Sequence, residues 1–222
     1  EERNLQQFAG NFAQNKTVRF PEVFPDLSTS RVLTMELLDG MDLDKLVTLH
    51  GAQRPERVVH FLVQACHSLV EAHEVGLVHR DIKPANLFVT RKGREVDVVK
   101  VLDFGLATRP VAERLPDARS THEGTIIGTP AYMAPEQVLG DKQLDGRADL
   151  YTLGLIGWWL LTGRDAFQAT AATQVMFAHV HVDAEPPSSH APGIPPELDA
   201  IILKCLAKKR EDRYADADAL AD

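Results

Sequence analysis

Three polar side chains of different chemistry lie close together in the stretch "VHRDIKPANLFVT", residues 78–90. Asp81 is a carboxylate, Lys83 a compact cation and Asn86 an amide, and they follow a His-Arg pair and precede a short apolar run. Such a set can hold charge and exchange protons, or it can be a solvated turn beside a buried strand. The residues downstream decide between these two interpretations.

The elements around this stretch are predicted from hydrophobic period and turn signals. Two β-branched runs, "NLFVT" and "VDVVKVLDF", flank the turn-like "RKGRE" and predict a hairpin directly behind the polar set. A long helix begins near Pro55 and ends at Gly76. Residues 106–135 are irregular and polar, which predicts a functional loop. The other expected elements are helices at 1–14, about 145–161, 170–180 and 196–207, and a buried strand at 31–38.

Composition restricts the function classes. The chain has 222 residues, a hydrophobic fraction of 44% and a net charge of -8, which fits a globular domain and argues against nucleic-acid binding. Cys66 and Cys205 have no paired spacing and are predicted to be core thiols. The apolar run at 150–163 is shorter than a membrane span requires. The chain opens on Glu1 and stops inside a helical pattern, so we expect a piece of a longer protein.

Three motifs in order carry a resemblance to a known family. "HRDIKPAN" resembles the catalytic loop of protein kinases, "DFG" at 103–105 their metal-binding motif, and "APE" at 134–136 the end of their activation segment. The chain is most similar to bacterial Hanks-type serine/threonine kinases. The resemblance implies an α+β, protein-kinase-like fold with a mostly helical large lobe at 39–222, an activation segment at 103–136 and a truncated small β lobe at 1–38.

The same resemblance implies the catalytic roles. Asp81 would accept the proton of the attacking hydroxyl or orient it, and Lys83 would lie over the migrating phosphoryl group. Asn86 and Asp103 would be oxygen ligands to Mg²⁺ on the phosphates of ATP. Thr129 would hydrogen-bond Asp81 and Lys83. A lysine at this loop position is the serine/threonine pattern, so the expected substrates are protein serine and threonine hydroxyls.

The nucleotide site is expected at "TMELLDGMDL" and in the hairpin. By resemblance, Met35 is the gatekeeper, Glu36 and Leu38 make backbone contacts to adenine, Asp42 is a candidate for the ribose, and Phe88 contacts ATP. A buried strand followed by a turn would have a similar sequence, so that alternative stays open.

The same resemblance implies structural and regulatory positions. His79 and Phe104 would form a packed column with Leu5 beside the Gly105 turn, and Glu1 occupies the place of the paired glutamate. Asp149 would hold the backbone of the catalytic loop, and Glu136 would pair with Arg213 as a structural ion pair. Arg80 would receive phosphate from Thr121 or Thr125, although an ordinary Ser/Thr-rich loop is an equal alternative. The structural and regulatory residues that the resemblance implies are Glu1, Leu5, His79, Arg80, Phe104, Gly105, Thr121, Thr125, Glu136, Asp149 and Arg213.

The first 38 residues depart from the family pattern and are more similar to UbiB-like atypical kinases. A UbiB-like ATPase and a non-catalytic, kinase-shaped scaffold are therefore alternative functions. The chain contains no GxGxxG loop and no VAIK-type lysine, so we expect weak ATP affinity and little transfer from residues 1–222 alone. A homodimer for phosphorylation of the activation segment and a cytoplasmic location are further expectations, with any membrane anchor outside this chain. The histidines show no convincing ligand spacing and are expected to be satisfied or exposed.

Overall fold

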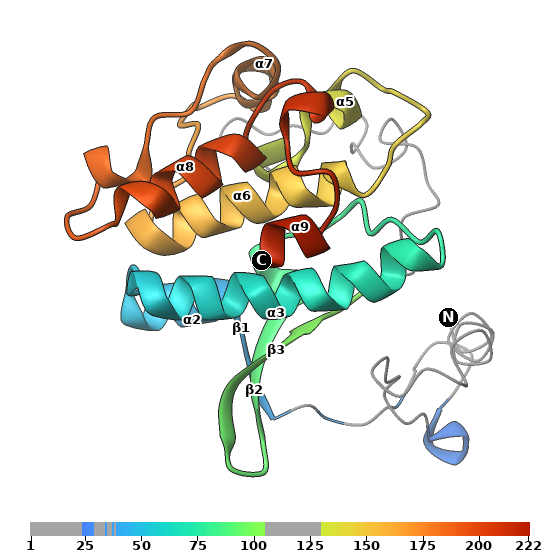
Figure 1. Cartoon of the computed structure of the whole chain (residues 1–222). Coiled ribbons are helices and arrows are strands. Elements are labelled where there is room, and N and C mark those ends of the chain that lie inside the picture. The colour runs from blue at the N-terminus through green and yellow to red at the C-terminus, as the bar shows by residue number, and fades with distance from the viewer. Residues whose placement is uncertain (1–23, 29–33, 35–36, 38, 105–129) are drawn as a thin grey trace.

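The computed structural model describes residues 24–28, 34, 37, 39–104 and 130–222 (Figure 1). Within these ranges the chain forms a small antiparallel sheet and a larger helical body. Short 3₁₀ turns connect the elements: η1 (Pro25–Leu27), η2 (Pro84–Asn86), η3 (Pro130–Tyr132), η4 (Pro187–Ser189) and η5 (Arg210–Asp212).

The described sheet contains β1 (Gly40–Asp42), β2 (Leu87–Lys92) and β3 (Glu95–Val101) in the order β1-β2-β3. The predicted hairpin is confirmed, because β2 and β3 pair antiparallel with Phe88 opposite Lys100. Strand β1 pairs with β2 and leads directly into α2 (Leu43–His50), two elements that the sequence patterns did not predict. The hairpin extends below α3 in Figure 1 and carries the polar loop at its base.

Four of the predicted helices are present, with ends within a few residues of the expected ones. They are α3 (Pro55–Glu74), α6 (Arg147–Thr162), α7 (Ala172–His181) and α8 (Pro196–Cys205). The short helices α5 (Pro135–Val138) and α9 (Asp218–Ala221) complete the body, and α5 begins inside the predicted loop. Helix α3 begins at a proline in its first turn, where the missing N–H costs nothing.

Helix α6 is the centre of the core, and this explains its continuous apolar run. Residues from Ala148 to Leu161 are all buried, so no polar face is needed. Helix α8 packs closely against it, because a Cβ at Gly154 would come within 2.6 Å of the Cys205 Cβ. A Cβ at Gly157 would come within 2.5 Å of the Ile202 side chain. The two glycines therefore set the distance between the helices.

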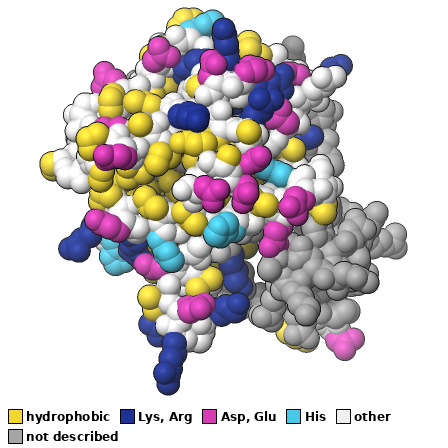
Figure 2. Space-filling view, viewed as in Figure 1, with side chains coloured by type: hydrophobic (Ala, Val, Ile, Leu, Met, Phe, Trp, Pro, Cys, Tyr) yellow, Lys and Arg dark blue, Asp and Glu magenta, His cyan; other side chains and the backbone are white. Residues whose placement is uncertain are grey.

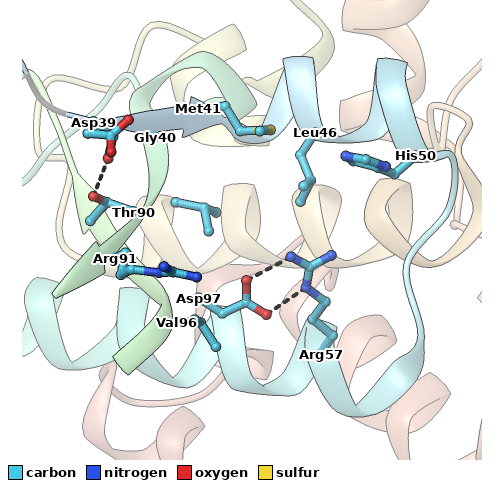
Figure 3. A pocket seen from close by; sticks show the side chains of 11 residues that line it. Asp39, Gly40, Met41, Leu46, His50, Arg57, Thr90, Arg91, Val96 and Asp97 are labelled. Carbon is cyan, nitrogen blue, oxygen red and sulfur yellow. Dashed lines mark hydrogen bonds and ion pairs between the residues drawn. The ribbon is translucent and has the colours of Figure 1, made fainter. Parts of the chain in front are cut away.

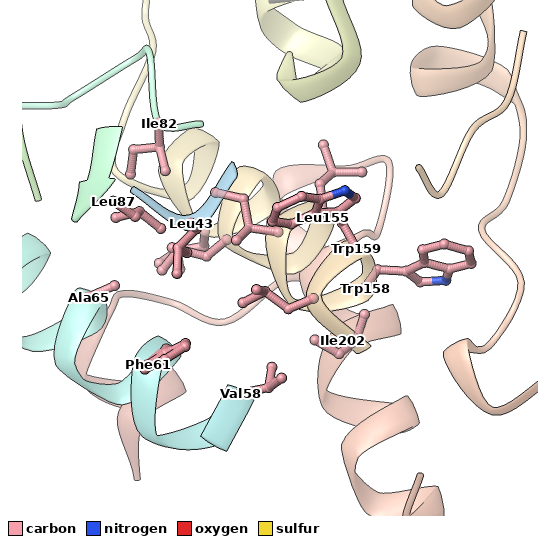
Figure 4. Close-up of a cluster of buried hydrophobic side chains, with 14 of the residues drawn as sticks. Leu43, Val58, Phe61, Ala65, Ile82, Leu87, Leu155, Trp158, Trp159 and Ile202 are labelled. Atoms are coloured by element: carbon pink, nitrogen blue, oxygen red, sulfur yellow. The ribbon is translucent and has the colours of Figure 1, made fainter. Parts of the chain in front are cut away.

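The tandem tryptophans are core residues, as predicted. Trp158 is 1% exposed, and its indole N–H donates to the Glu185 carbonyl at 2.8 Å. Figure 4 shows the buried cluster around it, to which α3 contributes Val58 and Phe61 and α8 contributes Ile202. Leu43 from α2 and Leu87 from β2 join the same cluster, so the core attaches the sheet to the helices. Cys66 and Cys205 are buried free thiols, as expected, and burial raises the pKa of each to about 12.

Several expectations concern residues outside the described ranges. The helix at 1–14 lies wholly outside them. Of the strand expected at 31–38, only Thr34 and Leu37 are described, and neither is in a strand. Among the described helices, none is long and apolar enough to cross a membrane. Acidic and basic side chains are interspersed over the face in Figure 2, and the hairpin end carries the exposed Arg91, Lys92 and Arg94.

Candidate active site

The buried carboxylate of Asp149 fixes the backbone at the start of the polar loop. It lies in the first turn of α6, is 1% exposed and accepts from the backbone N–H of His79 at 2.9 Å and of Arg80 at 2.8 Å. Arg80 has φ +64°, a conformation that non-glycine residues adopt only when their surroundings impose it. The predicted contact of Asp149 is therefore present. The sequence did not reveal that His73 Nε2 also bonds this carboxylate, at 2.8 Å.

The loop brings Asp81, Lys83 and Asn86 together around the turn η2. Lys83 Nζ donates to Asp81 Oδ2 at 2.9 Å, and Asn86 Nδ2 donates to the Asp81 carbonyl at 2.9 Å. The side chains of Asp81 and Lys83 are 16% and 31% exposed. Both charged ends are thus held in place by protein contacts on one side and remain accessible on the other.

His79 connects this loop to the segment that carries Asp103. Its Nε2 bonds the Leu102 carbonyl at 2.8 Å and must be the donor, so Nδ1 is free to accept from the Asp81 N–H at 3.3 Å. The Leu102 N–H in turn donates to the Asn86 carbonyl at 2.8 Å. Asp103 follows directly, with φ +62° and an exposed side chain. The two motifs are therefore joined side by side through a fully buried histidine.

Phe104 packs against the same imidazole. Its ring centroid lies 4.7 Å from that of His79, at an interplanar angle of 58°. This is the part of the predicted packed column that the described residues contain. Leu5, the third member, lies outside them.

Asn86 and Asp103 fit a site for Mg²⁺ bound together with phosphate. The Asn86 amide uses Nδ2 for the loop, which leaves Oδ1 as its hard oxygen donor, and the Asp103 carboxylate faces solvent. The described residues contain no group of three or more His, Cys, Asp and Glu side chains that could hold a metal by themselves. Mg²⁺ commonly keeps several waters and is bound through one or two protein ligands plus substrate phosphates, which agrees with this sparse set.

The two described residues of the expected nucleotide site lie opposite each other. Asp42 in β1 pairs in register with Phe88 in β2. Asp42 also caps α2, because its Oδ1 accepts from the Lys45 N–H at 2.7 Å. That leaves Oδ2 for a ligand hydroxyl. Sequence reasoning did not identify the capping role, although an Asp before an amphipathic run is a common helix start.

A shallow pocket of about 520 Å³ lies on the neighbouring part of the sheet (Figure 3). Met41, Val89 and Leu46 line it together with Arg57, whose guanidinium forms two hydrogen bonds to Asp97 at 2.7 and 2.8 Å. It includes none of the residues predicted for catalysis or for metal binding. Val89 lines the pocket, whereas its neighbour Phe88 does not.

Gln137 is a site residue that the sequence did not reveal. Its side-chain amide Nε2 donates to the Arg80 carbonyl at 2.9 Å, and its Oε1 accepts from the Ala134 N–H at 2.9 Å. The side chain is 4% exposed. It therefore joins the "APE" segment to the residue that precedes Asp81.

The predicted pair of Glu136 and Arg213 is present and buried. Arg213 Nη1 and Nη2 donate to the two carboxylate oxygens at 2.7 and 2.8 Å, and Arg213 is 4% exposed. The guanidinium also donates to the carbonyls of Ala207, Arg147 and Lys208. The pair thus connects α5 to the C-terminal helices and lies apart from the reacting groups.

The histidines outside the loop divide between surface and core. His60 and His67 are exposed, and His60 bonds Gln64. His73 forms a hydrogen bond with the Asp149 carboxylate. His179 is fully buried. Nine of the predicted site residues lie outside the described ranges, so the structure does not place them: Glu1, Leu5, Met35, Glu36, Leu38, Gly105, Thr121, Thr125 and Thr129.

Comparison with known proteins gives matches over nearly the whole chain. The family described as "Protein kinase domain" matches residues 4–222. The serine/threonine-protein kinase Pkn1 of Myxococcus xanthus is 48% identical over 185 residues, which are 82% of this chain and 25% of that protein. PknB of Mycobacterium tuberculosis is 38% identical, over 83% of this chain and 28% of that protein. The chain thus spans about a quarter of the length of these curated relatives.

A solved structure shows the same fold. The kinase domain of Mycobacterium tuberculosis PknI superposes with a TM-score of 0.67 at 24% identity, covering 100% of this chain and 76% of that one. These findings confirm the expected kinase-like fold and the similarity to bacterial serine/threonine kinases. None of the relatives described above supports the UbiB-like resemblance of the first residues.

Proposed function

Since the chain belongs to the protein kinase domain family, we propose that the protein transfers the γ-phosphoryl group of ATP to serine and threonine hydroxyls of proteins. The observation that carries the proposal is the joined arrangement of Asp81, Lys83 and Asn86 with the Asp103 segment through His79. The relatives named as serine/threonine-protein kinases support the choice of substrate class.

Asp81 is the residue that orients the attacking hydroxyl. Its Oδ2 is engaged by Lys83 and its backbone by His79 and Asn86, so Oδ1 is the atom left to accept a hydrogen bond, and then the proton, from serine or threonine. Lys83 places a positive charge beside this carboxylate, through its contact to Oδ2, where it would face the negative charge of the transferring phosphoryl group.

Magnesium bound together with ATP would supply positive charge that offsets the negative charge on the phosphates. Asn86 Oδ1 and the Asp103 carboxylate are the described groups that would hold the metal. Asp42 and Phe88, paired across β1 and β2, are the described groups that would contact the nucleoside. Met35, Glu36 and Leu38 would complete the adenine site, and Thr129 would bond Asp81 and Lys83.

Regulation is proposed through phosphate on the activation segment. Thr121 or Thr125 would be phosphorylated, in trans within a homodimer, and Arg80 would receive the phosphate. Support comes from the rigid attachment of Arg80, whose N–H bonds Asp149 and whose carbonyl accepts from Gln137. The cytoplasm is the proposed location, because ATP is available there and both cysteines are free.

The test is a radiolabelled ATP assay on the full-length protein with a serine/threonine protein substrate. Asp81→Asn should retain the fold and nucleotide binding yet reduce transfer by at least about a hundredfold, because the proton acceptor is lost. Asp103→Asn should weaken nucleotide binding in the presence of magnesium, because the charge of a metal ligand is removed. Asp212→Asn, an exposed change in η5, is the matched control.

The outcomes separate the alternatives. Label released only as inorganic phosphate would favour an ATPase of the UbiB-like type. Neither transfer nor hydrolysis would favour a scaffold. Undiminished transfer by Asp81→Asn would remove this residue from the mechanism.

A further inference from the structure

The shallow pocket beside β1 lies next to an irregularity in the hairpin. The pairing of β2 with β3 shifts around Arg91, which lies opposite two residues of β3, Val96 and Asp97. An extra residue of this kind bends a strand and changes the direction of its side chains. All three residues line the pocket, although successive residues of a regular strand point to opposite faces (Figure 3). The bulge therefore brings an apolar side chain and a carboxylate to one pocket.

Side chains of α3 fix this bulge. Asp97 has φ +59°, a conformation that few non-glycine residues adopt and that aspartate tolerates better than most. Arg57 donates two hydrogen bonds to the Asp97 carboxylate, at 2.7 and 2.8 Å, and Gln64 Nε2 donates to the Asp97 carbonyl at 2.9 Å. Gln64 Oε1 also accepts from the Val99 N–H at 3.0 Å. The pocket is thus preformed, and the charge of Arg57 is already compensated by Asp97.

Four apolar residues line the same pocket. Leu46 and Val89 are 3% and 7% exposed and belong to the core, and Met41 is partly buried against it. Val96, in contrast, is 57% exposed. Covering Val96 with another apolar group would remove hydrophobic surface from water, which is favourable. The pocket therefore suits an apolar side chain of a ligand.

Positive charge continues from the pocket along the hairpin. Arg91 lines the pocket and is exposed, and Lys92 and Arg94 follow at the exposed end of the hairpin (Figure 2). Within the part of the chain that the structure describes, no ion pair involves these three side chains. The nearby exposed acids are Asp39, which lines the pocket, and Glu95. This region thus has an excess of positive charge in a chain whose net charge is -8.

We propose that the pocket is a docking site for an acidic segment of a partner protein, which places an apolar side chain against Met41 and Val96 and carboxylates against Arg91 and the hairpin cations. Val89 and Lys92 are three residues apart on β2, which is roughly 10 Å at about 3.3 Å per residue. A ligand that reaches both must be extended, with acidic residues about two to four positions from the apolar one. The pocket contains none of the residues expected to bind nucleotide or metal, so the docking goes beyond the proposed kinase function and does not depend on it.

Peptide selection on the full-length protein tests the proposal. The probes are two libraries of short peptides with a Leu, Met or Phe anchor, one with Asp or Glu at the flanking positions and the other with Gln there. We expect the acidic library to be enriched at least about tenfold over the Gln library, because only carboxylates form charge-assisted hydrogen bonds to arginine. The best acidic peptide should bind about tenfold more weakly to Arg91→Gln and about fivefold more weakly to Val96→Ser. Lys142→Gln and Val75→Ser, at exposed positions, are the matched controls.

A charge reversal tests the ionic contact directly. The double variant Arg91→Glu with Arg94→Glu should lose the acidic peptide and bind the corresponding lysine peptide more tightly than the parent protein does. Equal enrichment of the two libraries would overturn the proposal, as would unchanged binding of the best peptide to Arg91→Gln and to the double variant. Equally tight binding of single-stranded RNA or of vesicles with anionic headgroups would mean that the hairpin attracts any anion, and would overturn it too. Fluorescence anisotropy measures binding without ATP, so absence of phosphoryl transfer would contradict only the proposed function.

Discussion

The Gln137 side chain spans two segments that are far apart in the sequence, donating to the Arg80 carbonyl at 2.9 Å and accepting from the Ala134 N–H at 2.9 Å. Both contacts are made by one buried amide. The position of Asp81, the next residue after Arg80, therefore depends on the residue that follows the "APE" motif. Gln137→Glu separates the two contacts, because a carboxylate keeps the acceptor but cannot donate to the Arg80 carbonyl.

We expect Gln137→Glu to lower the rate of transfer by roughly tenfold, since the Arg80 carbonyl would face a negative charge in place of a donor. Steady-state kinetics of the full-length protein would measure this. Gln143→Glu, an exposed position, is the matched control. Equal rates for Gln137→Glu and the control would show that the contact does not position the catalytic loop.

Asp149→Asn should destabilise the fold as well as the loop. The carboxylate accepts from two backbone N–H groups and from His73, and an amide can provide only one acceptor oxygen. Loss of charge-assisted hydrogen bonds at a buried site predicts a decrease in the free energy of unfolding of about 2–3 kcal/mol. Urea unfolding would measure it, with Asp212→Asn as the exposed control; a decrease no larger than in that control would contradict the role.

Substitutions of Arg213 and Glu136, which form a buried ion pair, should have non-additive effects on the free energy of unfolding. Arg213→Met leaves the Glu136 carboxylate buried without its partner, and the expected cost is about 3–5 kcal/mol of unfolding free energy. The double variant with Glu136→Gln should recover part of that loss, because the uncompensated charge is removed. A double-mutant cycle by urea unfolding measures the coupling, and strictly additive losses would argue against it.

Local patterns predicted the elements whose signals are contained within one stretch of chain. A local sequence pattern predicts each of three elements: the helical period predicts α3, the continuous apolar run predicts α6, and the turn residues predict the hairpin. By contrast, β1 has three residues and follows no alternation, so it was missed together with α2. A strand this short is defined by its pairing to β2, which a local pattern does not contain.

The candidate site divides in the same way. Asp81, Lys83 and Asn86 are neighbours in sequence and were found as a motif. The Gln137 contact to Arg80 joins residues separated by 57 positions, and the His73 contact to Asp149 joins residues separated by 76. His179 looked like one histidine among several until the fold placed it against Tyr151. Such residues are recognised from their burial and from their contacts in the folded structure, and a short stretch of sequence contains neither kind of information.

At Gly40, the backbone conformation and the close approach of β2 should exclude any larger side chain. It has φ +153°, and a Cβ there would come within 2.2 Å of the Val89 carbonyl oxygen. Gly40→Ala should therefore shift β1 away from β2 and destabilise the protein by more than about 2 kcal/mol, since both strain and overlap contribute. Gly51→Ala is the control, because its φ is +70° but nothing lies within 4 Å, and it should cost only about 1 kcal/mol. Thermal unfolding would compare them, and equal losses would refute the overlap argument.

Because His179 is buried, the free energy of unfolding should depend on pH between about 4 and 6.5. Burial lowers the pKa of His179 from 6.5 to about 4 in the folded protein. Between these two values the unfolded chain binds the proton and the folded protein does not. The stabilising effect of the neutral ring is thus fully present above about pH 6.5 and decreases as the pH falls toward 4, by about 3 kcal/mol in total.

The groups around His179 reinforce this direction. Lys208 and Arg213 are cations packed near Tyr151 and oppose a second charge, while Glu136 is already neutralised by Arg213. Urea unfolding of the parent protein and of His179→Gln from pH 4.5 to 8 provides the test, because carboxylates titrate alike in both. The difference in unfolding free energy between the two proteins should shrink as the pH falls through this window. Parallel curves, as expected for the exposed His181→Gln control, would show that the ring at position 179 is not held neutral by the fold.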